Sequence, residues 1–205
     1  MGGAFMFVVL DSGIKVWKNN LNKPHRDDGP AIECPDGSRE WWVDGKLHRV
    51  GGPAIECPDG LERWYFNDLL HREDGPAFSN PDGRQEWWLN GARHRVGGPY
   101  LIVPGEYREF GQYGILHRED GAAKEWDDGS FEYLFRGLRH RDDGPAVVYF
   151  DKNHKTYYEG WFRHGLRHRD DGPAVTREAR SGIHCEWWVN GEMLPDLNTK
   201  CSPFS

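Results

Sequence analysis

A heptad of the form HRxxGPA recurs along nearly the whole chain. It begins at His25, His48, His71, His94, His117, His140 and His168. The first five intervals are each 23 residues long and the last is 28. Self-similarity at a fixed period of this length is typical of repeat proteins, in which each unit buries its apolar surface against the next unit. We therefore expect seven tandem units, with the five extra residues of the last interval around Asp151–Lys155.

Each unit contains two β-prone runs separated by turn residues. In the second unit, Ala54–Cys57 is the first run and Leu61–Phe66 is the second, with Pro58–Gly60 between them and Asn67-Asp68 after them. The 26 glycines and 13 prolines of the chain agree with such regularly spaced turns. Turns at about every ten residues leave no stretch with helical periodicity. The sequence therefore predicts an all-β protein.

Asp-Gly and Asn-Gly pairs lie between several of these runs. Both central residues of a type I′ hairpin turn have positive φ, which glycine, asparagine and aspartate tolerate best. We therefore predict type I′ turns at Asp36-Gly37, Asp44-Gly45, Asp82-Gly83 and Asn90-Gly91.

A second spacing recurs with the same period. An aromatic residue is followed by glycine three residues later and histidine six residues later, as at Trp42, Gly45 and His48 and again at Trp88, Gly91 and His94. With the 23-residue period and a later Asp-Gly, this resembles the MORN repeat over about residues 17–191. HRxxGPA replaces the family's usual His-Gly-x-Gly, and the following Asp-Gly is shifted by two positions. The resemblance implies tandem β-hairpins that form one elongated, twisted antiparallel sheet.

The resemblance also implies that the end units need caps, because each unit packs only against its neighbours. We assign residues 1–16 to an N-terminal capping strand, chiefly Phe5–Val16, residues 17–191 to the repeat domain, and residues 192–205 to a C-terminal cap or tail. Exposed edge strands at either end would allow two copies to pair as a dimer.

Aromatic residues supply most of the large apolar surface, with 10 Trp, 8 Tyr and 10 Phe. One position of the second run always holds a ring: Trp41, Trp64, Trp87, Phe110, Tyr133, Trp161 and Trp187. A position that is aromatic in every unit is expected to build the repeat. We therefore interpret it as a stacked core ladder.

The residue after this ladder points to the opposite face of the sheet and varies. That position holds Trp42, Tyr65, Trp88, Gly111, Leu134, Phe162 and Trp188, and the residue on the same face before it is often glutamate, as at Glu40, Glu86, Glu109, Glu132 and Glu186. Rings beside carboxylates are common at protein interfaces. We propose Trp42, Tyr65, Trp88, Phe162, Trp188, Glu40, Glu86, Glu109 and Glu132 as protein-binding residues. The alternative is a face covered by side chains of its own repeat.

The heptad histidines suggest metal binding, but equivalent residues two strands apart are separated by about 10 Å, which is too far for shared ligation. We expect them to bond to neighbouring turns, and we expect no metal and no cofactor. The heptad arginines are followed by acids in most units, so we expect structural ion pairs. Val50-Gly51 and Val96-Gly97 replace the acids in units two and four, which makes Arg49 and Arg95 candidates for binding an external anion.

No motif of the sequence supports an enzyme. His-Arg-Asp occurs three times, as in a kinase catalytic loop, but no glycine-rich phosphate loop leads into a helix. A formal net charge of -7 argues against a general nucleic-acid binder and favours a partner with a basic surface. The start of the chain is apolar for too short a stretch to span a bilayer and lacks a basic segment, so we expect a cytoplasmic protein.

We therefore predict a non-enzymatic protein-binding module, an adaptor, scaffold or inhibitor. The MORN resemblance implies both protein association and contact with membrane lipids. Two alternatives remain open: an inhibitor of viral or phage type that blocks a nucleic-acid enzyme by acidic mimicry, and a repeat protein that binds anionic lipids through its arginines.

Overall fold

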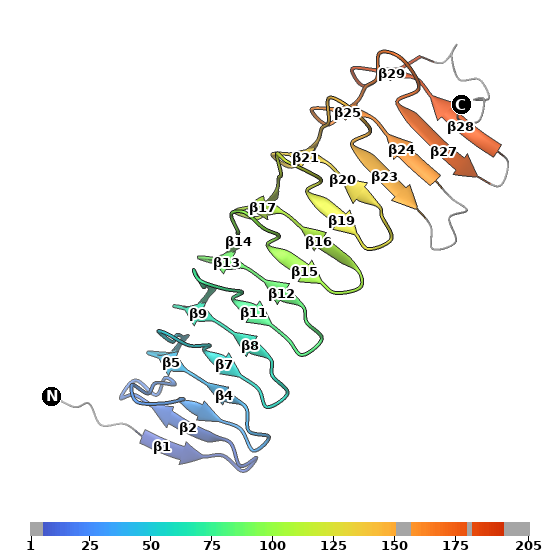
Figure 1. The fold of residues 1–205 in the computed structure, drawn as a ribbon. Helices are drawn as coiled ribbons and strands as arrows, with labels where there is room; N and C mark the ends of the chain where they lie inside the picture. The colour runs from blue at the N-terminus through green and yellow to red at the C-terminus, as the bar shows by residue number, and fades with distance from the viewer. Residues whose placement is uncertain (1–5, 151–156, 180–181, 195–205) are drawn as a thin grey trace. The chain divides into compact units, whose positions relative to one another are not determined.

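The fold is known from a computed structural model that describes residues 6–150, 157–179 and 182–194 (Figure 1). Every regular element within these ranges is a β-strand, which confirms the all-β class and the tandem hairpins. The expected insertion at Asp151–Lys155 lies outside the described residues. No helical segment of the described chain has the length and apolar character to cross a lipid bilayer.

The described strands fall into two kinds. Sixteen belong to a long antiparallel sheet, and the other fourteen form seven separate two-stranded hairpins. Each full repeat therefore contributes one hairpin to the long sheet and one small hairpin of its own. The chain divides into two compact units, residues 1–95 with 100–104 and residues 96–99 with 105–205.

In the first unit the strands of the long sheet follow one another in chain order (Figure 1). They are β1 (Met6–Val9), β2 (Lys15–Lys18), β3 (Ile32–Glu33), β4 (Arg39–Glu40), β7 (Ile55–Glu56), β8 (Glu62–Arg63), β11 (Phe78–Ser79), β12 (Gln85–Glu86) and β15 (Leu101–Val103). The small hairpins pair β5 (Trp42–Val43) with β6 (Lys46–Leu47), β9 (Tyr65–Phe66) with β10 (Leu69–Leu70), and β13 (Trp88–Leu89) with β14 (Ala92–Arg93).

The second unit repeats this plan. Its strands of the long sheet are β16 (Tyr107–Glu109), β19 (Lys124–Trp126), β20 (Phe131–Glu132), β23 (Val147–Phe150), β24 (Tyr157–Gly160), β27 (Val175–Ala179) and β28 (Gly182–Glu186). The small hairpins pair β17 (Gly111–Gln112) with β18 (Ile115–Leu116), β21 (Leu134–Phe135) with β22 (Leu138–Arg139), β25 (Phe162–Arg163) with β26 (Leu166–Arg167), and β29 (Trp188–Val189) with β30 (Glu192–Met193).

The second β-prone run of each repeat is not one strand. In the second repeat it breaks at Trp64, so that β8 joins the long sheet and β9 joins a small hairpin. The Trp64 N–H donates to Ala77 O at 2.7 Å, whereas its carbonyl accepts from His71 N at 3.0 Å. The chain leaves the long sheet at this residue because its two backbone groups bond to different segments.

The predicted turn types are confirmed in the small hairpins only. At Asp44-Gly45 both residues have positive φ, 51° and 79°, as a type I′ turn requires. At Asp36-Gly37 only the glycine does, with φ 91°. The type I′ prediction was therefore wrong at Asp36-Gly37, and equally at Asp82-Gly83, where again only the glycine has positive φ. Proline one residue before the aspartate favours a type I turn followed by a left-handed glycine.

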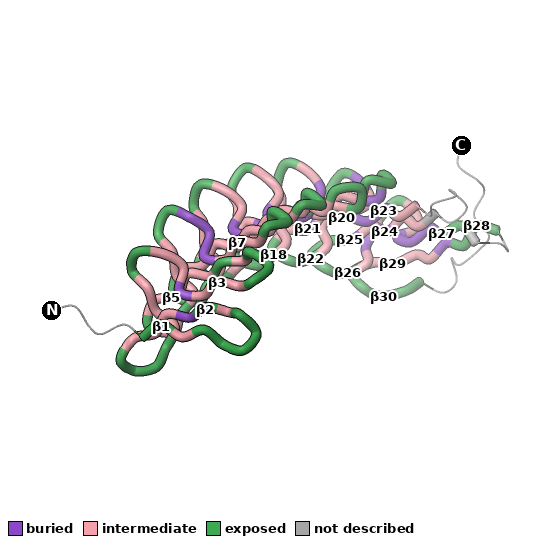
Figure 2. The backbone as a smooth tube through the Cα atoms, turned by 90° about the horizontal axis from the view of Figure 1, so that it is seen from below, coloured by how far each residue is buried: buried purple, intermediate pink, exposed green. Residues whose placement is uncertain are grey.

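The core of each repeat is small and lies where the heptad ends. The last residue of the heptad is fully buried in most repeats, namely Ala31, Ala54, Ala77, Ala123, Ala146 and Ala174, and the fourth repeat has the buried Tyr100 instead. Figure 2 shows that buried stretches are short and that most of the chain is only partly buried. Stability must therefore come from many partial contacts between neighbouring repeats.

The aromatic ladder has one more member than predicted, Trp17, which precedes Trp41. Trp17 bonds through its N–H to Ala31 O at 2.8 Å and accepts from His25 N at 2.9 Å, as the ladder residues of later repeats do. Its ring lies 4.8 Å from that of Phe7 in β1. The N-terminal hairpin of β1 and β2 therefore supplies both a ladder member and a ring that covers it.

Candidate functional site

The register of the long sheet defines two faces. Directly paired residues share a face, and in the first unit one such row runs through Ile32, Glu40, Ile55, Arg63, Phe78, Glu86 and Leu101. We call this side, with the small-hairpin residues that bond to it, the tryptophan–glutamate face. The other side carries Glu33, Glu56 and the heptad arginines, and we call it the arginine–aromatic face.

Three tryptophans of the small hairpins bond to glutamates of the long sheet on the tryptophan–glutamate face. Trp42 Nε1 donates to Glu40 at 2.7 Å, Trp88 Nε1 to Glu86 at 3.0 Å, and Trp188 Nε1 to Glu186 at 3.0 Å. The predicted aromatic and acidic positions therefore do share a face. Each indole is half-buried and held in one orientation by its carboxylate.

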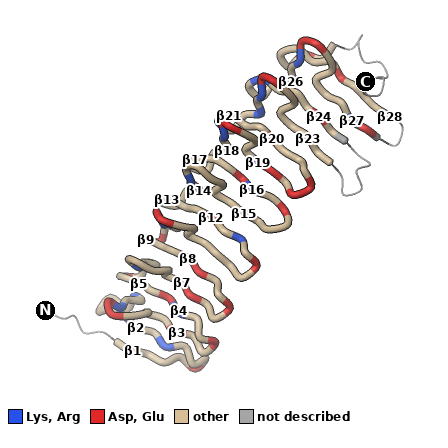
Figure 3. The backbone as a smooth tube through the Cα atoms, in the orientation of Figure 1, with Lys and Arg blue, Asp and Glu red and all other residues tan. Residues whose placement is uncertain are grey.

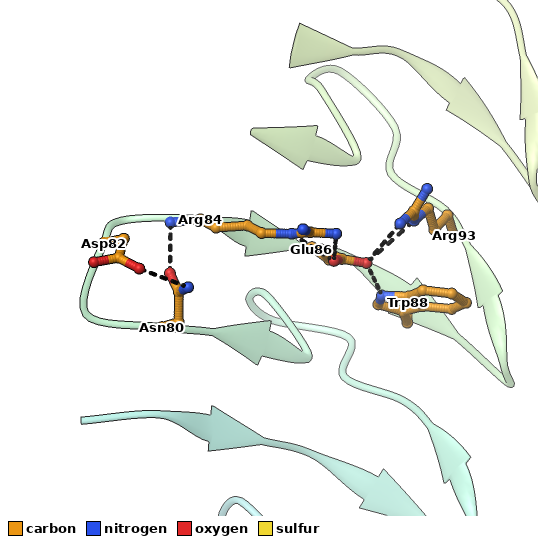
Figure 4. A network of polar contacts seen from close by, with 6 residues as sticks. All are labelled: Asn80, Asp82, Arg84, Glu86, Trp88 and Arg93. Atoms are coloured by element: carbon orange, nitrogen blue, oxygen red, sulfur yellow. Dashed lines mark hydrogen bonds and ion pairs between the residues drawn. The ribbon is translucent and has the colours of Figure 1, made fainter. Parts of the chain in front are cut away.

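The most extensive of these networks is centred on Glu86 in the first unit (Figure 4). Only 6% of Glu86 is exposed. Its two oxygens accept from Arg84 Nε at 2.9 Å, from Arg93 Nε and Nη2 at 3.1 and 3.0 Å, and from the Trp88 indole. These charged donors offset part of the cost of burying the Glu86 carboxylate.

Two glutamates of the second unit have comparable partners. Glu132 accepts from Arg139 Nη2 at 3.2 Å and from the Tyr149 hydroxyl. Burial, and then the bond to Glu132, raises the pKa of Tyr149 above its ordinary value. Glu109 lies 2.9 Å from Lys124 Nζ. These glutamates therefore face bases of their own protein.

The remaining predicted residues differ in how much surface they offer. Phe162 is 7% exposed and belongs to a cluster with Ala146 and Val147, so little of its ring can reach a partner. Tyr65 is half-buried in β9. Trp42, Trp88 and Trp188 are likewise half-buried, and Arg93 and Arg167 lie over the rings of Trp88 and Trp188 at 5.3 and 4.8 Å.

On the arginine–aromatic face, each heptad arginine lies over a ladder ring. The distances from guanidinium carbon to ring centroid are 3.7 Å for Arg49 over Trp41 and 3.8 Å for Arg72 over Trp64. A Cβ added to Gly75 would lie 2.7 Å from the Arg72 guanidinium carbon. A side chain at the heptad glycine would therefore force the guanidinium to move from its position over the ring.

The acids of the heptad hold these arginines in place. The Nε of Arg26, Arg72, Arg118, Arg141 and Arg169 donates to the aspartate two residues later, at 2.7 to 2.9 Å. This confirms the prediction of structural ion pairs. The side-chain hydrogen bond to the arginine, and then its charge, lowers the pKa of Asp28, Asp74, Asp120, Asp143 and Asp171.

We expect these five aspartates to titrate below the ordinary range for the residue, and Arg72→Gln to bring the pKa of Asp74 back toward it. A carboxyl group with a depressed folded-state pKa contributes stability above its unfolded pKa of about 3.9 and loses it as the pH falls through the folded value. Carboxyl carbon shifts measured by NMR between pH 2 and 6 test this. An unchanged Asp74 titration in Arg72→Gln would contradict it.

Six heptad histidines accept a bond at Nδ1 from the turn that ends their own repeat, which confirms the predicted bond to a neighbouring turn. His25 Nδ1 accepts from Asp44 N at 3.0 Å, and His71 Nδ1 accepts from Asn90 N at 3.2 Å. The donors are the residues of positive φ that open the type I′ turns. Such a histidine stabilises a turn residue of positive φ in its own repeat, through the tautomer that carries its proton on Nε2.

The two candidate anion-binding arginines are stacked like the others. Arg49 Nη1 donates to Glu56 at 2.5 Å and to Pro53 O at 2.9 Å. Arg95 lies 3.8 Å above the Trp87 ring, and burial lowers its pKa. Among the described residues no group of three or more His, Cys, Asp or Glu side chains is placed to hold a metal ion.

Sequence reasoning missed the bases that bond to the glutamates. Arg93 and Arg139 immediately precede the heptad histidines and stand seven residues after Glu86 and Glu132. This spacing was a usable signal. It brings the residues together because the small hairpin turns the chain back toward the long sheet. The sequence matches no protein-family model and no curated protein. The candidate site is therefore defined by its geometry.

Proposed function

We propose that this chain is a non-enzymatic protein-binding repeat module, MORN-like in its repeat motif, that contacts its partner through the tryptophan–glutamate face. The observation that carries the proposal is the set of three half-buried indoles, each fixed by a bond to a glutamate. Aromatic side chains that are already ordered lose little entropy on binding and commonly anchor interfaces.

The charge on this face is mixed, because the glutamates bond to Arg84, Arg93 and Arg139. The exposed acids lie elsewhere, on the heptad loops and on the turns of the long-sheet hairpins, where red segments recur in Figure 3. Asp74 and Asp120, for example, are 80% and 84% exposed. With a net charge of -7, these acids favour a basic partner by steering its approach.

Affinity capture from the native host, compared between the wild type and the Trp42→Ala/Trp88→Ala variant, tests the proposal. We expect the double variant to capture at most about one tenth of the partner that the wild type captures, since a buried indole anchor contributes about 2 kcal/mol or more. Quantitative mass spectrometry of the captured proteins measures the ratio.

A matched control is Leu21→Ala, which removes a large apolar side chain that is 70% exposed. It should leave capture unchanged. Circular dichroism must show that the double variant is folded. Equal capture by the folded double variant and the wild type would refute a role for this face, and capture of lipid or of a nucleic-acid enzyme would identify the class of partner.

A further inference from the structure

The second repeat differs from its neighbours at two heptad positions. In the third repeat the heptad reads His71-Arg72-Glu73-Asp74-Gly75, whereas the second has Val50 and Gly51 in place of the two acids. Gly51 has φ 75°, and an added Cβ there would meet no atom within 4 Å. The loop is therefore open where other repeats place a carboxylate.

Both acids have definite roles where they are present. The first faces the histidine Nε2, at 3.3 Å for His25 and Asp27 and at 3.8 Å for His71 and Glu73. The second accepts from the arginine Nε, at 2.8 Å for Arg72 and Asp74. In heptads that have both acids, the histidine Nε2 and the arginine Nε thus face carboxylates of the same loop.

In the second repeat these two donors have no protein acceptor. Within the described part of the chain, the hydrogen bonds of the His48 side chain are made by Nδ1, to Asn67, and those of the Arg49 side chain by Nη1. Val50, which replaces the first acid, is 80% exposed. The Arg49 Nε–H is therefore available to a ligand. His48 Nε2 is available as a second donor in the tautomer whose Nδ1 accepts from Asn67 N.

The bond from Arg49 to Glu56 does not prevent a second carboxylate from binding. Arg118 shows this directly, because its Nη1 donates to Glu125 at 2.7 Å while its Nε donates to Asp120, also at 2.7 Å. One guanidinium of this fold can therefore bind two carboxylates at once. Arg49 has only the first of them.

The two donors line a pocket of about 590 Å³ between the first and second heptad loops. Trp41, Val43 and Val50 supply apolar walls, and Arg26, Asp27 and Asp28 form the side that belongs to the first repeat. Asp28 is bonded to Arg26, and Asp27 faces His25. The charges of the two arginines and two aspartates in the lining cancel, so the pocket as a whole does not attract anions. Hydrogen bonds to the ligand must therefore provide its preference for a carboxylate.

We propose that this pocket binds the carboxylate of an acidic side chain, aspartate or glutamate, presented by a protein partner. The carboxylate takes the place that Glu73 and Asp74 fill in the third repeat and accepts from Arg49 Nε and His48 Nε2. The methylene groups of the ligand contact Val50. The site lies on the arginine–aromatic face and is thus independent of the function proposed for the opposite face.

Titration with N-acetyl-glutamate-N-methylamide, followed by the NMR signals of the arginine Nε–H groups, tests the proposal at low salt. We expect the Arg49 signal to shift and saturate, whereas the neutral glutamine analogue leaves it in place. The Arg72 signal is the internal control, because its Nε is already bonded to Asp74. No saturable shift of Arg49, or an equal shift with the glutamine analogue, would overturn the proposal.

Two exchanges between repeats complete the test. Val50→Glu with Gly51→Asp gives the second repeat the heptad HREDGPA of the third. Gly51 has φ 75° whereas Asp74 has no positive φ, so the loop must take the backbone of the third repeat, and circular dichroism must show that the variant is folded. We expect the folded variant to bind the probe at least about tenfold more weakly. In the reverse exchange, Glu73→Val with Asp74→Gly, the Nε–H signal of Arg72 should also shift and saturate with the probe. Undiminished binding in the first variant would also overturn the proposal, whatever the second variant shows.

Discussion

Trp64→Ala is expected to lower the free energy of unfolding by about 3 kcal/mol, a loss typical of large aromatic residues cut to alanine in protein interiors. The Trp64 ring lies 3.8 Å beneath the Arg72 guanidinium, and its backbone links two segments of neighbouring repeats. Removing the ring leaves the guanidinium without its stacking partner. Because these contacts join the second repeat to the third, the loss weakens the interface between them.

Urea unfolding followed by far-ultraviolet circular dichroism measures this effect. Trp64→Phe is the matched control, since it keeps a ring beneath Arg72. The Trp64 Nε1–H is buried and has no acceptor among the described residues, so its removal costs little and partly offsets the smaller ring. A loss below about 1 kcal/mol in Trp64→Ala would show that the aromatic ladder is not the core of the repeat.

Glu86→Ala is expected to cost about 2–3 kcal/mol, because it leaves several partly buried donors without an acceptor. These donors are the guanidinium groups of Arg84 and Arg93 and the indole of Trp88. The arginines are 40% and 30% exposed, so hydration recovers part of the loss. The same change should also free the Trp88 ring to adopt other orientations.

Glu40→Ala provides the comparison at the equivalent position of the first repeat. Within the described residues the Glu40 carboxylate accepts a bond from Trp42 Nε1 and none from an arginine, so its removal should cost only about 1 kcal/mol. Urea midpoints of the two variants, measured under one set of conditions, give the difference. Equal losses would mean that the arginines of the Glu86 network contribute nothing to stability.

Much of the repeat could be predicted because its signals are local. The 23-residue period fixed the number of units, and alternation along a strand placed Trp41 and Trp42 on opposite faces. The bonds of Trp161 to Glu159 and of Trp188 to Glu186 agree with this, since the two glutamates lie in different rows of the sheet. The bond of the heptad histidines to a turn was predictable because equivalent histidines lie too far apart to share a metal ion. The pairing of the heptad arginines with acids was predictable because the acids directly follow them in the chain.

The surface chemistry of the glutamates could not be predicted in the same way. Their positions suggested an acidic strip, but Arg93 returns through a turn to bond with Glu86. Whether two residues seven positions apart meet depends on where the chain leaves the long sheet. A run that looks continuous in the sequence gives no sign of this break.

The sequence by itself determined the all-β class, the period and the ladder of rings, because each of these follows from the spacing of residues along the chain. Only the tertiary structure decided that every repeat divides into two hairpins, that Trp17 joins the ladder, and that the glutamates bond to arginines. These features depend on register and on backbone bonds between repeats. Such bonds join residues that no local pattern relates.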